Sequence, residues 1–224
     1  MTKVYPNANT TGIAAAASFE KLINPCPSSD GNLVVLTVWK KSLLFNCNGF
    51  TVFDAKGNLV FRVDTYCSGS KGEISLMDAS GKSLLTIRRK RLSLSDNWLI
   101  YDGETTVNPI LSVRKQVNRL NSKSLAHVTS GCASSSGKGS SPVSSPKSPL
   151  YDIQGSYPQR CCAVYDGDRR RVAEIKRKEP GVGGVAFGVD VFRLVVQPEM
   201  DAAVAMALVI LLDQMFGSSK RFSI

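Results

Sequence analysis

The chain has 224 residues, 43% of them hydrophobic, and its 28 lysine and arginine residues outnumber its 18 aspartate and glutamate residues, which gives a net charge of +10. This composition is ordinary for a globular protein and predicts one domain of generous size or two small ones. The positive charge predicts anionic partners such as nucleic acid, acidic lipid headgroups or acidic proteins. A single histidine, His127, nearly excludes metal sites and catalytic triads that are built from histidines.

The first 20 residues lack a charged segment followed by a long apolar run, so we expect no secretory signal and a cytoplasmic protein. The six cysteines are spaced neither as a CxxC zinc site nor as a small disulfide framework. We therefore expect free thiols. Residues 1–30 are poor in large apolar side chains and are predicted to form a flexible tail.

From Leu33 onwards the chain reads as strands joined by turns. Three hairpins share one design, in which an apolar strand, an aspartate-containing turn and a returning strand follow one another, at 49–64, 73–89 and 161–178. Further strands are predicted at Trp98–Asp102, Ile110–Lys115, Leu125–Thr129, Leu150–Gly155 and, in one or two pieces, Val185–Val196. This weak internal repeat suits an antiparallel meander.

A segment rich in serine, glycine and proline at 130–149 is predicted to be a mobile loop between two strands. Ser141, Ser145 and Ser148 each precede a proline, and we treat them as candidate phosphorylation sites. Phosphate groups there would add negative charge to a basic protein and weaken its binding to anions. The alternative is a passive linker.

Near the end of the chain, residues 198–216 are predicted to form one helix. Pro198 suits the first helical position, Glu199 and Asp201 suit the first turn, and Gly217 follows the last one. Residues 202–212 are apolar at every position, so the helix must be buried on all sides. An apolar run of this length is shorter than the roughly 20 residues of a membrane span. We expect a core helix and no transmembrane span; a helix that docks on a partner stays open as an alternative.

About a dozen strands precede this helix, and a barrel of that size is too wide for its own side chains to fill. A helix of 19 residues is about 28 Å long, close to the height of a strand of about eight residues. We therefore predict a mainly β fold, a closed antiparallel barrel of about twelve strands that encloses the C-terminal helix. The single domain would cover residues 31–217, followed by a tail at 218–224.

No pattern in the sequence indicates catalysis. Gly137-Lys138 lacks the strand, helix and Ser/Thr of a phosphate-binding loop, and the glycines at 181–184 precede a strand instead of a helix. The carboxylates in the turns are explained by turn chemistry. We expect no catalytic residue, no metal and no cofactor.

The basic clusters are the candidate binding residues. A barrel with an apolar interior sends half of each strand outward, so two basic hairpins would form one positive outer patch if they lay close together. A solvated surface that protects against aggregation is the alternative. The candidates for anion or lipid binding are Arg88, Arg89, Lys90, Arg91, Arg169, Arg170, Arg171, Lys176, Arg177 and Lys178.

Three segments closely resemble the plant LURP-one-related proteins, namely LTVWKKSLLF at 36–45, GFTVFD at 49–54 and GNLVFRV at 57–63. The resemblance runs from about residue 30 to Gly217. It implies a barrel of about twelve strands around a buried C-terminal helix, as in the superfamily that includes the Tubby C-terminal domain and the phospholipid scramblases. No Tubby lipid-binding motif can be placed on this sequence residue by residue.

For function, the resemblance implies a non-enzymatic, regulatory module that associates with membranes through phosphoinositides or other acidic phospholipids, in plant defence. It would be cytoplasmic, peripheral at the plasma membrane or shuttling to the nucleus. One alternative is a protein-interaction scaffold in defence signalling. A second is a nucleic-acid-binding transcription regulator, which the net charge favours and the absence of aromatic residues among the basic clusters disfavours.

Overall fold

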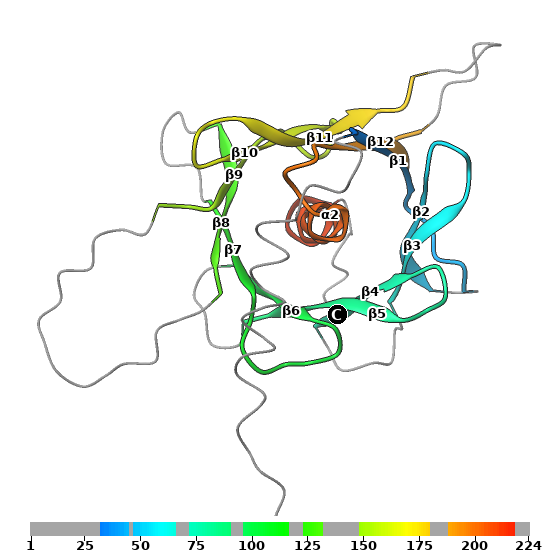
Figure 1. The fold of residues 1–224 in the computed structure, drawn as a ribbon, viewed down its shortest axis with the longest axis horizontal. Helices are drawn as coiled ribbons and strands as arrows, with labels where there is room; N and C mark the ends of the chain where they lie inside the picture. Colours follow the sequence, from blue (N-terminus) through cyan, green and yellow to red (C-terminus); the bar gives the residue numbers. More distant parts are fainter. Residues whose placement is uncertain are drawn as a thin grey trace, which may run out of the picture.

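The computed structural model describes residues 32–44, 47–65, 72–90, 96–116, 123–131, 148–179 and 188–217. In these ranges, twelve antiparallel strands close into a barrel around one helix (Figure 1). The strands are β1 (Val34–Trp39), β2 (Asn48–Phe53), β3 (Leu59–Thr65), β4 (Glu73–Asp78), β5 (Ser83–Arg89), β6 (Asn97–Asp102), β7 (Leu111–Lys115), β8 (Ser124–Ser130), β9 (Tyr151–Ser156), β10 (Cys161–Asp166), β11 (Arg171–Arg177) and β12 (Val191–Val196). The helix is α2 (Ala202–Phe216).

Each strand pairs with its neighbours in the sequence, and the first strand closes the barrel against the last. The pairing of β1 with β12 runs from Val34 opposite Val196 to Trp39 opposite Val191. An up-and-down meander of this kind needs only short connections, and its closure leaves no sheet edge free to aggregate. The predicted fold class is confirmed.

The core consists of the inward side chains of the strands packed around helix α2. Figure 1 shows this helix inside the ring of strands. On β1, for example, Leu36 and Val38 point inward and are 2% and 0% exposed. All residues of α2 from Val204 to Asp213 are buried, as expected for a helix that the sheet surrounds. Within the described ranges, no helix combines the length and the apolar character needed to cross a membrane.

The helix begins four residues later than predicted. The side chain of Asp201 accepts hydrogen bonds from the backbone N–H groups of Ala203 and Val204, at 2.8 and 3.0 Å, and so caps a helix that starts at Ala202. The preceding residues form a turn, in which Met200 N–H donates to the carbonyl of Gln197. Proline and the acidic residues therefore correctly indicated that a helix starts near them. Asp201 is the N-cap of this helix and not a residue of its first turn.

The three predicted hairpins are β2–β3, β4–β5 and β10–β11, and their turns share one geometry. In each, the aspartate side chain accepts backbone N–H groups two or four residues later, as Asp54 does from Lys56 and Asn58. The fourth residue of each turn has a positive φ. In the first two turns it is Gly57 or Gly81, and in the third it is Arg169, with φ of 62°. The weak sequence repeat is therefore a structural one.

Other predicted boundaries shift by a few residues or lie outside the described ranges. The strand predicted within Val185–Val196 is confirmed as β12, from Val191 to Val196. The predicted loop at 130–149 is described only at its two margins, where Ser130 still belongs to β8. The predicted tails at 1–30 and 218–224 lie outside the described residues.

The barrel has two chemically distinct ends. Because neighbouring strands are antiparallel, the odd-numbered strands end and the even-numbered strands begin at the same end. Helix α2 also ends there, since Lys40, directly after β1, contacts Asp213 in the last part of α2. We call this the α2-C end; its described residues are 39–44, 47–48, 64–65, 72–73, 88–90, 96–97, 114–116, 123–124, 156–161, 176–179, 188–191 and 213–217. The opposite α2-N end comprises 32–34, 53–59, 78–83, 102–111, 130–131, 148–151, 166–171 and 196–201.

Candidate anion-binding end of the barrel

The α2-C end gathers most of the positive charge of the barrel. Among its described residues, the basic ones are Lys40, Lys41, Arg88, Arg89, Lys90, Arg114, Lys115, Lys123, Arg160, Lys176, Arg177 and Lys178. The acidic ones are fewer: Asp64, Glu73, Asp96, Glu179, Asp190 and Asp213. The α2-C end is therefore the surface on which an anionic partner would be attracted.

The α2-N end has the opposite balance. Its described acidic residues are Asp54, Asp78, Asp102, Glu104, Asp166, Asp168, Glu199 and Asp201, against the basic residues Lys56, Lys82, Arg169, Arg170 and Arg171. The turn aspartates belong to this end because the turns of the β2–β3, β4–β5 and β10–β11 hairpins and the N-cap of α2 lie there. The charge of the two ends also complements the helix, whose N-terminus is partially positive and whose C-terminus is partially negative.

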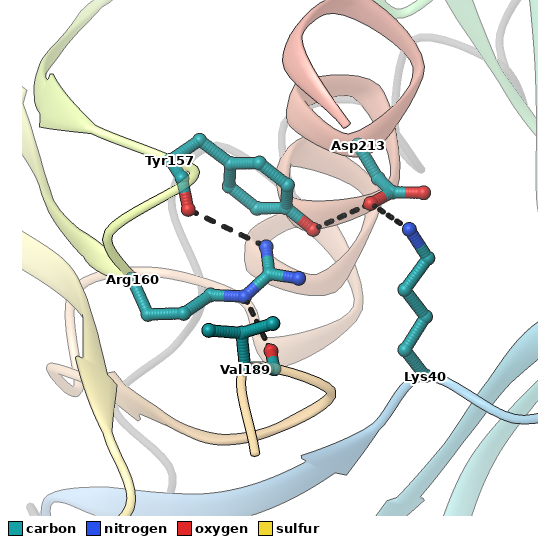
Figure 2. A network of polar contacts seen from close by, with 5 residues as sticks. All are labelled: Lys40, Tyr157, Arg160, Val189 and Asp213. Carbon is teal, nitrogen blue, oxygen red and sulfur yellow. Dashed lines mark hydrogen bonds and ion pairs between the residues drawn. The ribbon is translucent and has the colours of Figure 1, made fainter. Parts of the chain in front are cut away.

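A buried polar network fixes the end of helix α2 within the α2-C end (Figure 2). Asp213, whose side chain is only 7% exposed, accepts a hydrogen bond from Lys40 Nζ at 2.8 Å and one from the Tyr157 hydroxyl at 3.2 Å. Burial, followed by the nearby Asp213 carboxylate, raises the pKa of Tyr157 well above its ordinary range, so its hydroxyl stays protonated and donates. The network ties α2 to β1 and to the β9–β10 turn.

Arg160 lies beside this network in the β9–β10 turn and is 5% exposed. Its guanidinium lies 4.1 Å from the centre of the Tyr157 ring and 4.5 Å from that of Phe192, both within cation–π range. Arg160 Nε donates to the carbonyl of Val189 at 2.8 Å, as Figure 2 shows. The contacts hold Arg160 rigidly between the turn and the start of β12.

A second lysine secures the last turn of the helix from the other side. Lys115 Nζ donates to the carbonyl of Met215 at 2.9 Å and lies 4.6 Å from the centre of the Phe216 ring. A lysine at a helix C-terminus satisfies a carbonyl that has no partner within the helix and neutralises the partial negative charge there. Lys40 and Lys115 therefore have a structural role in addition to their charge.

A small pocket opens between these groups. It has a volume of about 180 Å³ and is lined by Lys40, Tyr157, Pro158, Arg160, Val189, Asp190, Phe216 and Gly217. Two cationic side chains line it from different parts of the chain, Lys40 directly after β1 and Arg160 in the β9–β10 turn. This is too small for a drug-sized ligand, for which pockets of about 300–1,000 Å³ are usual. It could admit a small charged group.

Exposed apolar side chains accompany the basic ones at the same end. Trp39 at the end of β1, Leu43 in the following connection and Val189 before β12 are 44%, 54% and 51% exposed. Lys41 Nζ lies 5.5 Å from the centre of the Trp39 ring. Tryptophan beside basic residues is typical of surfaces that meet the boundary between lipid headgroups and acyl chains.

The structure places the predicted basic residues in two groups. Arg88, Arg89 and Lys90 at the end of β5, and Lys176–Lys178 at the end of β11, share the α2-C end but lie halfway round the barrel from each other (Figure 1). Arg169–Arg171 lie at the α2-N end. The two hairpins therefore form no single patch on the barrel wall, because six pairings separate β5 from β11 in either direction. Arg91 lies outside the described residues.

Several of these side chains are already paired with carboxylates. Arg88 pairs with Glu73 and Arg89 with Asp96, and Glu174 contacts both Arg171 and Lys176. Arg170 pairs with Asp166 and Asp168, and Arg177 donates to Gln159. Exposed pairs of this kind contribute little to stability, but they reduce the charge that the arginines present to a ligand.

Of the candidate phosphorylation sites, Ser148 is exposed at the α2-N end, and Ser141 and Ser145 lie outside the described residues. A tilted strand of six residues separates the two ends by roughly 15–20 Å. This exceeds the Debye length of about 8 Å at physiological salt. We therefore expect a phosphate at Ser148 to have little direct effect on anion binding at the α2-C end.

The residues of this polar network, and Arg160 beside it, were not predicted from the sequence as site residues. Lys40 belongs to the Trp-Lys-Lys-Ser-Leu block that carries the family resemblance, and Asp213 interrupts an otherwise apolar helix, so both gave a signal. Tyr157 and Arg160 gave none, because their positions become meaningful only when the β9–β10 turn is folded against β12.

The comparisons with known proteins agree with the fold. A sequence model described as LURP-one-related matches residues 34–213. Protein LURP-one-related 8 of Arabidopsis thaliana is 52% identical over 222 residues, covering 98% of this chain and 100% of that protein. LURP-one-related 17 of the same plant is 42% identical and covers 92% of this chain and 94% of its own. An X-ray structure of an Arabidopsis thaliana protein matches with a TM-score of 0.58 and 23% identity, covering 82% of this chain and 91% of that one. The chain belongs to the LURP-one-related family.

Proposed function

We propose that this barrel is a non-enzymatic module that binds acidic phospholipid headgroups, including phosphoinositides, through its α2-C end. The observation that carries the proposal is the meeting of basic residues with an exposed tryptophan at that one end, where Leu43 and Val189 are exposed as well as Trp39. The cell location that follows is the cytoplasmic face of a membrane, where anionic lipids give a negative surface potential.

Exposed basic residues would strengthen such binding without a lipid anchor. Each basic residue close to an anionic leaflet contributes about 1 kcal/mol. Lys41, Lys90 and Lys123 are exposed at the α2-C end, so together they would contribute about 3 kcal/mol, or roughly a hundredfold in affinity. The acidic α2-N end would face away from the membrane, which gives the bound barrel one orientation.

The test is cosedimentation with vesicles of phosphatidylcholine alone, or with added phosphatidylserine or phosphatidylinositol bisphosphate, at low and physiological salt. Two triple variants lose the same three positive charges at opposite ends. The α2-C variant carries Lys41→Gln, Lys90→Gln and Lys123→Gln; the α2-N variant carries Lys56→Gln, Lys82→Gln and Arg169→Gln.

We expect the α2-C variant to bind acidic vesicles at least tenfold more weakly, whereas the α2-N variant binds like the wild type. Equal losses in both variants would mean that net charge alone matters, and the oriented surface would be rejected. A wild-type protein that ignores vesicles but binds single-stranded RNA or duplex DNA would support the nucleic-acid alternative. If the protein bound neither vesicles nor nucleic acid, the protein-interaction scaffold would be the remaining alternative.

A further inference from the structure

Arg160 combines three properties that rarely occur together. It is 5% exposed, its backbone adopts a φ of 52°, and its guanidinium is enclosed by two aromatic rings. The left-handed backbone is unfavourable for a residue other than glycine. Such conformations persist where the surrounding structure imposes them, often at functional sites.

The hydrogen bonds of the guanidinium within the described ranges go to uncharged groups. Among the described residues, no carboxylate forms an ion pair with Arg160, and its hydrogen bonds go to the backbone carbonyls of Val189 and Tyr157. Asp213, the carboxylate of the neighbouring network, already accepts from Lys40 and Tyr157. A buried charge normally requires a partner of opposite sign.

The pocket of about 180 Å³ offers the place for that partner. Arg160 and Lys40 both line it, and Asp190, which also lines it, is exposed, so water screens its charge. A planar guanidinium binds oxyanions through paired N–H groups, and phosphate groups above all. The rest of the lining consists of Tyr157, Pro158, Val189 and the C-terminal end of helix α2.

We propose that this pocket binds one phosphomonoester group, with Arg160 and Lys40 as its cationic contacts. The proposal deepens the proposed function and rests on it where the phosphate belongs to a lipid. A phosphomonoester carries a charge of about −1.5 to −2 at pH 7, so it compensates Arg160 better than the single charge of a phosphodiester. The rest of the α2-C end adds affinity for a phosphate that is presented on an acidic membrane.

The test compares vesicles of equal surface charge that contain either phosphatidylserine or a lipid with a phosphomonoester, such as phosphatidic acid or phosphatidylinositol bisphosphate. The variants are Arg160→Gln, Arg160→Lys and the control Arg170→Gln, which removes the same charge at the α2-N end. We expect the wild type and Arg170→Gln to prefer the phosphomonoester vesicles about tenfold. Both Arg160 variants should lose the preference and keep their binding to phosphatidylserine.

A second measurement uses the wild type alone, in case the Arg160 variants do not fold. The Nε–H resonance of Arg160 in an NMR spectrum should shift in a saturable way with soluble inositol trisphosphate and, at higher concentration, with inorganic phosphate. Inositol itself should leave it unchanged. A shift with the soluble phosphates but no preference among vesicles would place the ligand in solution instead of in a membrane.

The outcomes separate the two proposals. A wild type that binds all acidic vesicles equally, with an Arg160 resonance that does not titrate, would overturn the phosphate pocket and leave membrane binding intact. Folded Arg160→Gln protein that keeps the phosphomonoester preference would overturn it as well. A wild type that binds no acidic vesicle would overturn the proposed function, while the resonance titration would still decide whether the pocket binds phosphate.

Discussion

At the scale of single residues, the partly buried ion pair of Lys40 and Asp213 links the segment after the first strand to the helix. Asp213 is the more buried partner, with 7% of its side chain exposed against 28% for Lys40. Removing Lys40 therefore leaves a charge that water cannot reach, whereas removing Asp213 leaves a lysine that can turn towards solvent. The two single substitutions should differ in their cost for this reason.

We predict that Lys40→Met lowers the free energy of unfolding by about 3–5 kcal/mol and Asp213→Ala by about 2–3 kcal/mol, the latter including the lost acceptor of the Tyr157 hydroxyl. Urea unfolding followed by circular dichroism measures both. The double variant Lys40→Met/Asp213→Ala should be more stable than Lys40→Met alone. Strict additivity of the two substitutions would show that the pair is not coupled.

At the scale of elements, the hairpin turns at the α2-N end contribute to stability in a pH-dependent way. A hydrogen bond from the Ser80 side chain, then one from the Lys82 backbone, lowers the pKa of Asp78 below its ordinary value of 3.8. Hydrogen bonds from Asn58 similarly lower the pKa of Asp54. A carboxyl group with a lowered folded-state pKa stabilises the fold above its unfolded pKa, and this stabilisation is lost as the pH falls through the folded value.

We therefore predict that Asp78→Ala destabilises the protein at pH 7 and has a smaller effect well below pH 3.8, where wild-type Asp78 is itself protonated. Urea unfolding across this range measures the difference between the two proteins. Ser80→Ala, which removes the largest cause of the shift, is the control and should act in the same direction more weakly. If the difference in stability between the wild type and Asp78→Ala did not change with pH, the loss of stability would be due to turn geometry alone.

Helix α2 makes the strongest prediction for an element, because it is enclosed by the whole barrel. Leu208 is 1% exposed, and an aspartate there would be a buried charge without a partner. The cost exceeds the usual stability of about 5–15 kcal/mol for a folded domain or consumes most of it. We expect Leu208→Asp to abolish cooperative unfolding, and the volume-conserving Leu208→Met to cost less than about 1.5 kcal/mol. A Leu208→Asp protein that melts cooperatively would contradict the enclosed helix.

At the scale of the whole molecule, the two ends differ in charge, and the exposed tryptophan Trp39 lies at the basic α2-C end, so a bound barrel should have one orientation. The chain has two tryptophans, of which Trp39 is 44% exposed at the α2-C end and Trp98 is 7% exposed. In a Trp98→Phe background, lipids with brominated acyl chains should therefore quench Trp39 fluorescence on acidic vesicles.

The quenching should disappear with phosphatidylcholine vesicles and fall with rising salt, because the attraction is electrostatic. Soluble acrylamide serves as the control, since it should quench Trp39 less when acidic vesicles are present. Vesicle binding without any quenching by brominated lipid would show that another surface meets the membrane.

The sequence by itself determined the elements and the closed architecture. Alternating apolar residues, aspartate-containing turns and an entirely apolar helix are local patterns, and each follows from the chemistry of a few neighbouring residues. Even there, the helix start was misplaced by four residues, because Pro198, Glu199 and Asp201 all suit a helix N-terminus and only the folded backbone shows which one caps it.

The tertiary structure alone decided which charged residues act together. Lys40 and Asp213 are 173 positions apart, and strand order and barrel closure bring them into contact. The same geometry separates Arg169–Arg171 from Arg88–Lys90 and encloses Arg160 between Tyr157 and Phe192. The sequence shows how many basic residues the chain has and where they cluster along it. Which of them lie at the same end of the barrel depends on long-range strand pairing, which no short stretch of sequence encodes.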